Sequence, residues 1–152
     1  MICSPKAVNS KTKPVRVTLA GSIARRESWK QWIVGKYTSL KDGLECHGAG
    51  YQILPTPRRG TFAECCIAGV QRCDLLFAYI DSDDCQTILH EIAVGIERGK
   101  RVVVCFSPEV EHGGYWLITR LAFSVHLNVS HCCLGAILRF ECESFAKNGG
   151  DK

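Results

Sequence analysis

The chain has 152 residues, of which 46% are hydrophobic and 22% charged, and these values exclude wholesale disorder and predict one domain with a single core. The net charge of +4 is scattered in short groups, which argues against a nucleic acid polymer as partner. The N-terminus has no apolar signal region and no apolar stretch approaches bilayer length, so we expect no membrane partner and a cytoplasmic protein.

Residues 1–13 are polar and predict a flexible tail, followed by a single α/β domain over residues 14–147. In the first half we expect a strand at 15–20, a helix at 27–40, a glycine-rich loop at 41–50, a strand at 51–54 and a helix at 62–72. In the second half we expect a strand at 75–80, a helix that Asp84 caps and Gly99 closes, a strand at 101–107, a short helix opened by Gly113 and Gly114, a strand near 125–129 and a helix from about 132 to 145. Strands that alternate with helices predict a parallel sheet covered on both faces.

An acidic cluster follows the apolar run at 75–80 and is the most informative feature of the chain. Asp81 and Asp84 come directly after this run, and Glu91 lies among apolar residues of the next helix. Open α/β sheets place their ligand crevices at this point. Taken singly, Asp84 is most simply a helix cap and Asp81 a solvated side chain, but Glu91 has no such simple interpretation. Carboxylates around one crevice can divide the work of glycoside chemistry, one at the anomeric carbon and another handling protons.

The first strand runs into a Gly21-Ser22 turn and then a helix. Such a turn points backbone N–H groups above the sheet, which suits a phosphate or a sugar hydroxyl. The turn is neither G-x-G-x-x-G nor a Walker loop, and the chain has no G-x-S-x-G elbow.

The ten cysteines include no C-x-x-C pair, and neither they nor the five histidines show the spacing of a metal site. Several fall inside predicted elements, such as Cys105, where a reduced cysteine serves as a small hydrophobe. We therefore expect no structural metal.

Together these residues resemble one known family. Ala20-Gly21 at the first strand end, the run R-C-D-L-L-F-A-Y-I-D-S-D-D-C at 72–85, the helix with Glu91-Ile-Ala and the run R-G-K-R-V-V-V at 98–104 are similar to the nucleoside 2-deoxyribosyltransferase-like family, over about residues 15–122. The resemblance implies a flavodoxin-like three-layer sandwich with a five-stranded, mostly parallel sheet, no cofactor, and a homo-oligomer whose sites are shared between subunits.

The resemblance also implies the roles of individual residues. Glu91 aligns with the nucleophile that attacks the anomeric carbon of a nucleoside, and Asp84 and Asp81 with the acidic positions before it. A free glutamate has a pKa of about 4.3, so it is ionised at neutral pH and needs orientation only. The expected substrate-binding residues are Gly21, Ser22, Ile23, Arg25, His47 and Trp116.

Within this family two alternatives stay open. Gly21, Ser22, Ile23 and Arg25 resemble the phosphate loop of relatives that hydrolyse deoxynucleoside 5'-monophosphates, which would make the protein a nucleotide N-glycosidase. Members usually have Gly-Thr before the nucleophile, where this chain has Thr87-Ile88, and this departure keeps a non-catalytic nucleotide sensor in view.

Aromatic side chains are the candidates for subunit contacts. Trp29, Trp32, Tyr37 and Trp116 lie on predicted helices, and buried aromatic anchors dominate interface energetics. The alternative is that each covers the sheet of its own subunit.

Overall fold

The structure is a computed structural model that describes residues 15–21, 29, 33, 45–46, 51–53, 62–82 and 86–148. The strands are β1 (Val15–Ala20), β2 (Glu45–Cys46), β3 (Tyr51–Ile53), β4 (Leu75–Ile80), β5 (Arg101–Phe106) and β6 (Ser124–His126). The helices are α2 (Phe62–Arg72), α3 (Gln86–Glu97), the 3-10 turn η1 (His112–Tyr115), α4 (Trp116–Leu121) and α5 (His131–Lys147). The predicted tail at 1–13 lies outside the described residues, and of the predicted helix at 27–40 only Trp29 and Ile33 are described, both helical.

Among the described residues the sheet has six strands in the order β2-β3-β1-β4-β5-β6, in which every neighbouring pair is parallel except β2 with β3. The prediction of an α/β fold with a mostly parallel sheet is confirmed, whereas the count of five strands is wrong. The additional strand is β2, which lies within the predicted loop at 41–50 and pairs antiparallel with β3 at the sheet edge. Two residues are too few to show a period in the sequence, so this strand has no local signal.

The spatial order of the parallel strands is that of a doubly wound sheet. Without β2, the strands in chain order are arranged 2-1-3-4-5. In such sheets a crevice opens outside the carboxyl ends of the strands where the order reverses, here between β1 and β4.

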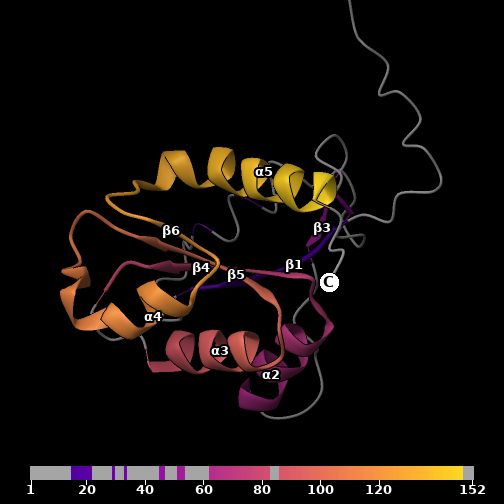
Figure 1. Ribbon diagram of the computed structural model, residues 1–152, viewed down its shortest axis with the longest axis horizontal. Helices are drawn as coiled ribbons and strands as arrows, with labels where there is room; N and C mark the ends of the chain where they lie inside the picture. Colours follow the sequence, from indigo (N-terminus) through magenta and orange to yellow (C-terminus); the bar gives the residue numbers. More distant parts are fainter. Residues whose placement is uncertain are drawn as a thin grey trace, which may run out of the picture.

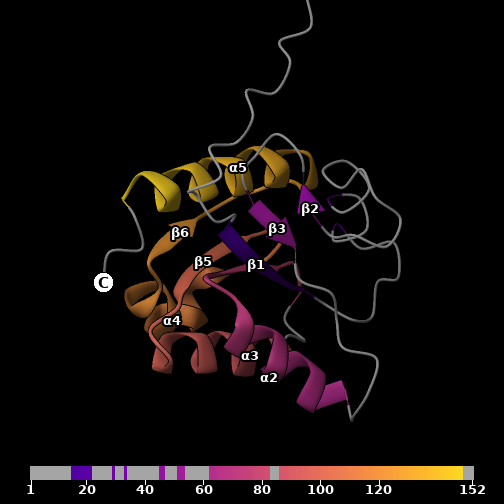
Figure 2. The same cartoon turned by 90° about the vertical axis from the view of Figure 1, so that its right-hand side faces the viewer.

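Helices cover both faces of the sheet, and β4 lies at its centre. Figures 1 and 2 show α5 on one face and α2 and α3 on the other. Leu75, Phe77 and Tyr79 of β4 belong to the hydrophobic cluster under α5, and the residues between them belong to the cluster under α2 and α3. A strand that is buried on both faces needs apolar residues at every position, which explains the continuous apolar run.

Gly99 closes α3 as predicted, through a Schellman motif. Its φ is +71°, its N–H donates to Ile96 O (3.1 Å), and the N–H of Lys100 donates to Gly95 O (2.9 Å). Glycine adopts this left-handed conformation without steric cost. The turn fixes where β5 begins, at Arg101.

The final strand differs from its prediction. β6 ends at His126, because Asn128 has a φ of +56° and turns the chain away from the sheet. Val129 lies beyond β6, yet it is buried, and its N–H donates to Phe106 O (2.8 Å). The apolar character of Val129 therefore reflects burial in a loop. The predicted short helix begins as a 3-10 turn that contains Gly113 and Gly114.

Candidate active site

Asp81 follows β4 directly and is buried at the carboxyl end of the sheet. Its relative exposure is 5%, so the interpretation that it is only a solvated side chain is wrong. Its Oδ1 atom is buried and has no hydrogen-bond partner within the described part of the chain. A buried polar atom without a partner costs free energy, and this cost is most often tolerated where the group has a function.

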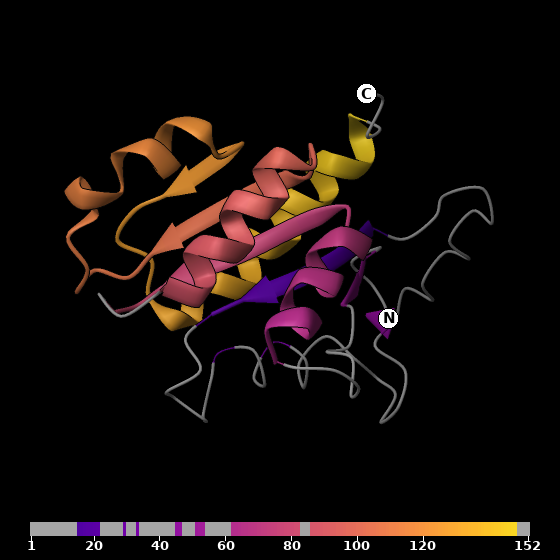
Figure 3. The same cartoon turned by 90° about the horizontal axis from the view of Figure 1, so that it is seen from below.

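Glu91 lies on the inner face of α3. Ile88, Glu91, Ile92 and Gly95 follow helical spacing and are all buried, and Glu91 has a relative exposure of 5%. The sequence-based expectation that Glu91 lies among apolar residues is thus confirmed. Figure 3 shows α3 lying across one face of the sheet, over β4 and β5. A carboxylate on this face is directed toward protein rather than solvent, which is unusual for a helical glutamate.

Gly21 directly follows β1 and begins the predicted phosphate loop, and close packing restricts this position to glycine. A Cβ atom on Gly21 would lie 2.6 Å from Nε1 of Trp29, which is buried. The indole ring meets Phe77 and Tyr79 edge to face, with centroid distances of 5.9 and 5.7 Å. Trp29 therefore covers the sheet of its own subunit, as the alternative interpretation of this residue held.

Tyr79 joins three segments behind the carboxyl end of β4. Its hydroxyl donates to Val129 O (2.8 Å), and its ring lies edge to face with His131, with a centroid distance of 5.3 Å. Burial raises the pKa of Tyr79, and the charge of Asp81 contributes in the same direction. The phenol is consequently held neutral, and it fixes the start of α5 relative to the strand that carries Asp81.

The fold brings Gly21, Asp81 and Ser107 to one edge of the sheet, at the carboxyl ends of β1, β4 and β5. Ser107 is buried, and its N–H donates to Ile80 O (2.9 Å), so it occupies the position beside Asp81. The sequence placed Ser107 in a strand, whereas its buried position beside Asp81 makes it a further candidate for the site. Its signal was its place as the first polar residue after an apolar run.

Several predicted site residues are not tested by these contacts. Asp84, Ser22, Ile23, Arg25 and His47 lie outside the described residues. Trp116 begins α4 with 64% of its surface exposed, and it belongs to neither hydrophobic cluster.

No group of three or more histidine, cysteine, aspartate or glutamate side chains is placed to hold a metal ion in the described ranges. The cysteines Cys73, Cys105 and Cys142 are buried, which agrees with the expectation that cysteines inside the predicted elements lie in the core. Burial raises the pKa of the Cys73 and Cys105 thiols, so both stay protonated. None of the helices that the structure describes is long and apolar enough to cross a membrane.

No protein-family model matches the sequence, and comparison with curated proteins finds no match. Among solved structures, a CMP N-glycosidase, BcmB, from Clostridium botulinum superposes with a TM-score of 0.58 and 13% identity, over 83% of this chain and 98% of the other. The sugar isomerase domain of an RpiR transcription factor from Sphaerobacter thermophilus gives 0.54 and 13%, over 91% and 75%. The Vibrio vulnificus NanR protein complexed with ManNAc-6P gives 0.51 and 10%, over 90% and 50%. At these identities the chain shares the fold of these proteins.

Proposed function

We propose that the protein cleaves the N-glycosidic bond of a nucleoside or a nucleoside 5'-monophosphate through a carboxylate nucleophile. The observation that carries the proposal is the pair of buried carboxylates, Asp81 at the end of β4 and Glu91 on the sheet-facing side of α3. Water-excluding surroundings strengthen the interaction of a carboxylate with the positive charge that develops on a sugar ring.

In the proposed mechanism a carboxylate oxygen of Glu91 attacks C1' of the sugar. The bond from C1' to the base nitrogen breaks, its electron pair leaves with the base, and an acidic group protonates that base. Asp81 or Asp84 supplies the proton or holds a sugar hydroxyl. Water then opens the glycosyl ester in hydrolysis, or a second base does so in transfer.

The remaining predicted residues complete the proposed site. Gly21, Ser22 and Ile23 would present backbone N–H groups to a 5'-phosphate and Arg25 would pair with its charge, while His47 and Trp116 would contact the base or sugar. The fold that the chain shares with a CMP N-glycosidase supports this class of reaction, and the strand order supports a flavodoxin-like classification.

The second candidate function is a sensor that binds a phosphorylated sugar or nucleotide without turnover. Two observations favour it. The first is that the chain shares its fold with the sugar isomerase domain of the RpiR transcription factor and with NanR, which was solved in complex with ManNAc-6P. The second is the sequence Thr87-Ile88 ahead of Glu91, where nucleoside 2-deoxyribosyltransferase-like proteins usually have Gly-Thr. Fold alone does not separate the two functions, because function resides in the site.

A product assay decides between these functions. The protein is incubated with CMP, other 5'-monophosphates and the corresponding nucleosides, with and without a second free base, and the products are separated by chromatography. Free base indicates a hydrolase and a new nucleoside indicates a transferase. Binding without turnover indicates a sensor. If the protein neither binds nor converts any of these compounds, both candidate functions are refuted.

Two variants locate the chemistry. Glu91→Gln keeps the size of the side chain and should reduce turnover by at least about 1,000-fold, because an amide is not a nucleophile here. Glu97→Gln is the matched control, since Glu97 is exposed on the same helix. Near-native activity of a folded Glu91→Gln would refute the nucleophile assignment.

The quaternary state is part of the proposal. The resemblance implies a homo-oligomer with shared sites, and exposed Trp116 is a candidate contact. Light scattering at micromolar concentration measures the mass, and a value near the 16.8 kDa of one chain would refute the oligomer.

A further inference from the structure

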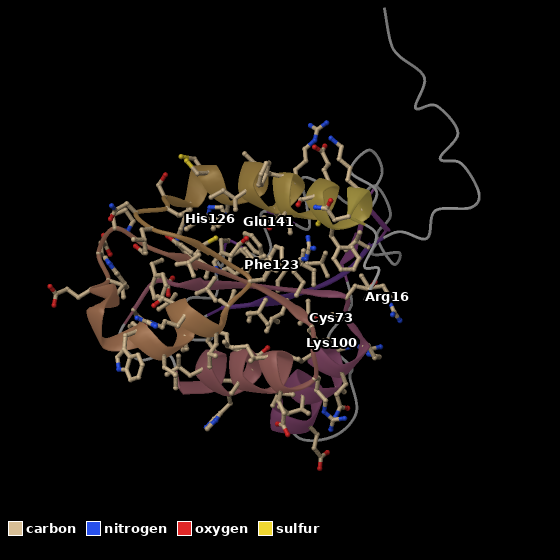
Figure 4. The ribbon with its side chains drawn as sticks, in the orientation of Figure 1. Arg16, Cys73, Lys100, Phe123, His126 and Glu141 are labelled. Carbon is tan, nitrogen blue, oxygen red and sulfur yellow. The ribbon has the colours of Figure 1, made fainter. Side chains whose placement is uncertain are left out.

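A pocket lies at the opposite edge of the sheet from Asp81. It has a volume of about 670 Å³ and is lined by the residues just before β4 and β5, the end of α5 and the segment between α4 and β6. This volume suits a ligand the size of a nucleotide or a smaller organic molecule. Figure 4 labels Cys73, Lys100 and Phe123, which line this pocket, and Arg16 next to it.

The charge of the pocket is positive. Arg98, Lys100 and Arg101 line it, together with one carboxylate, that of Asp74, which is already paired with Arg16. Arg16 donates to Asp74 from Nη2 (3.0 Å), from Nε (3.3 Å) and from its backbone N–H (3.0 Å). Burial of Asp74 favours a raised pKa, but the hydrogen bonds and charge of Arg16 outweigh it and lower the pKa. The charge of Lys100 contributes in the same direction, but one carboxylate that Arg16 already pairs does not offset three cations, so the lining keeps a net positive charge.

Arg98 and Lys100 by themselves have a simple structural role. They follow the C-terminal end of α3, where positive charge compensates the negative end of the helix dipole. Arg101 differs, because it is the first residue of β5. Its Cζ lies 3.9 Å from the centroid of the Phe123 ring and 5.0 Å from that of Phe145. Two aromatic rings therefore hold the guanidinium group in place at the pocket wall.

The fixed guanidinium group has an unused donor. Nη1 of Arg101 is buried and has no hydrogen-bond partner among the described residues. Leaving a buried charged donor unpaired costs about 1–3 kcal/mol or more, and an acceptor that reaches Nη1 through a small shift of the pocket wall would remove this cost. The planar fork of arginine, with a lysine beside it, matches the oxygens of a phosphate group.

We infer that this pocket binds a small organic phosphate. The phosphate group contacts Arg101 and Lys100, and an apolar or aromatic part of the ligand packs against apolar residues of the lining such as Ile96, Leu121 and Phe123. The pocket is separate from the proposed N-glycosidic site, so a bound phosphate here would be a second ligand and not the substrate of that site.

Isothermal titration calorimetry with phenyl phosphate and with inorganic phosphate tests the inference on the full chain. Phenyl phosphate should bind at least about tenfold more tightly than inorganic phosphate, because the ring adds buried apolar area. Arg101→Gln should weaken phenyl phosphate binding by about tenfold or more. Arg120→Gln removes the same charge from the exposed side of α4, outside the pocket lining, and should change affinity less than about twofold.

Lys100→Gln provides a second measurement if Arg101→Gln does not fold, as judged by circular dichroism. It should weaken phenyl phosphate binding by about three- to tenfold, since it removes one of the two contacting charges. Unchanged affinity in a folded Arg101→Gln or in Lys100→Gln would overturn the inference and place any binding elsewhere, including the proposed active site. Equal weakening by Arg120→Gln would reduce the effect to non-specific charge and also overturn it.

Discussion

Gly21→Ala should destabilise the protein, although it adds only one methyl group. The new Cβ would lie 2.6 Å from Nε1 of Trp29 and 2.9 Å from two carbons of its indole ring. Real Cβ contacts are never that short, so either the strand end or the ring must move. The ring is only 3% exposed and is packed edge to face against Phe77 and Tyr79, which leaves it no free direction. Overpacking of this kind costs about 1–3 kcal/mol.

Thermal denaturation followed by circular dichroism measures this cost. For a chain of this size each kcal/mol lowers the melting temperature by about 2–4 °C, so a decrease of about 2–12 °C is expected. Gly69→Ala is the control, because Gly69 is inside α2 and its new Cβ would be 3.6 Å from Thr18 Cγ2, an ordinary contact. That variant should gain about 0.5–1 kcal/mol from helix propensity. A Gly21→Ala protein as stable as the wild type would refute the packing of Trp29 on β1.

Three further predictions concern other contacts. His126→Ala should destabilise the fold by about 1–3 kcal/mol in urea denaturation, because Glu141 is only 2% exposed and would lose the partner of its Oε1 atom, His126 Nε2 at 2.9 Å. An unchanged denaturation midpoint would show that this contact does not contribute to stability. The pKa of Asp74 is lowered in the folded state, so its ion pair with Arg16 contributes stability above pH 3.8 that is lost as the pH falls through the folded-state pKa. Arg16→Gln should therefore be less stable than the wild type by under about 1 kcal/mol at pH 7, and the difference should shrink as the pH is lowered below 3.8; a difference that does not change with pH would contradict this. Cys132 is exposed and hydrogen bonding with Ser130 lowers its pKa, so iodoacetamide should modify it at least about tenfold faster than the buried thiols, as counted by peptide mass spectrometry; equal rates would argue against the burial described.

The sequence by itself determined the elements whose signals are local. The continuous apolar run at 75–80 predicted a strand buried on both faces, and the alternation of the two hydrophobic clusters along β4 confirms it. The glycine at position 99 predicted where α3 ends, because only a left-handed residue completes the closing turn. The same local patterns placed Asp81 directly after this strand and Glu91 within the helix that follows.

Tertiary structure alone decided which residues meet across the chain. The strand β2 is defined by its pairing with β3, because two residues are too few to show a hydrophobic period in the sequence. The contact of His126 with Glu141 joins β6 to α5, and the ring of Trp29 closes over Gly21 from a separate segment. Likewise the pocket around Arg101 collects residues from four segments that are distant in the sequence. Hydrophobic and hydrogen-bond patterns report on the faces of one element, whereas contacts between elements depend on sheet order and register, which the chain fixes only when it folds.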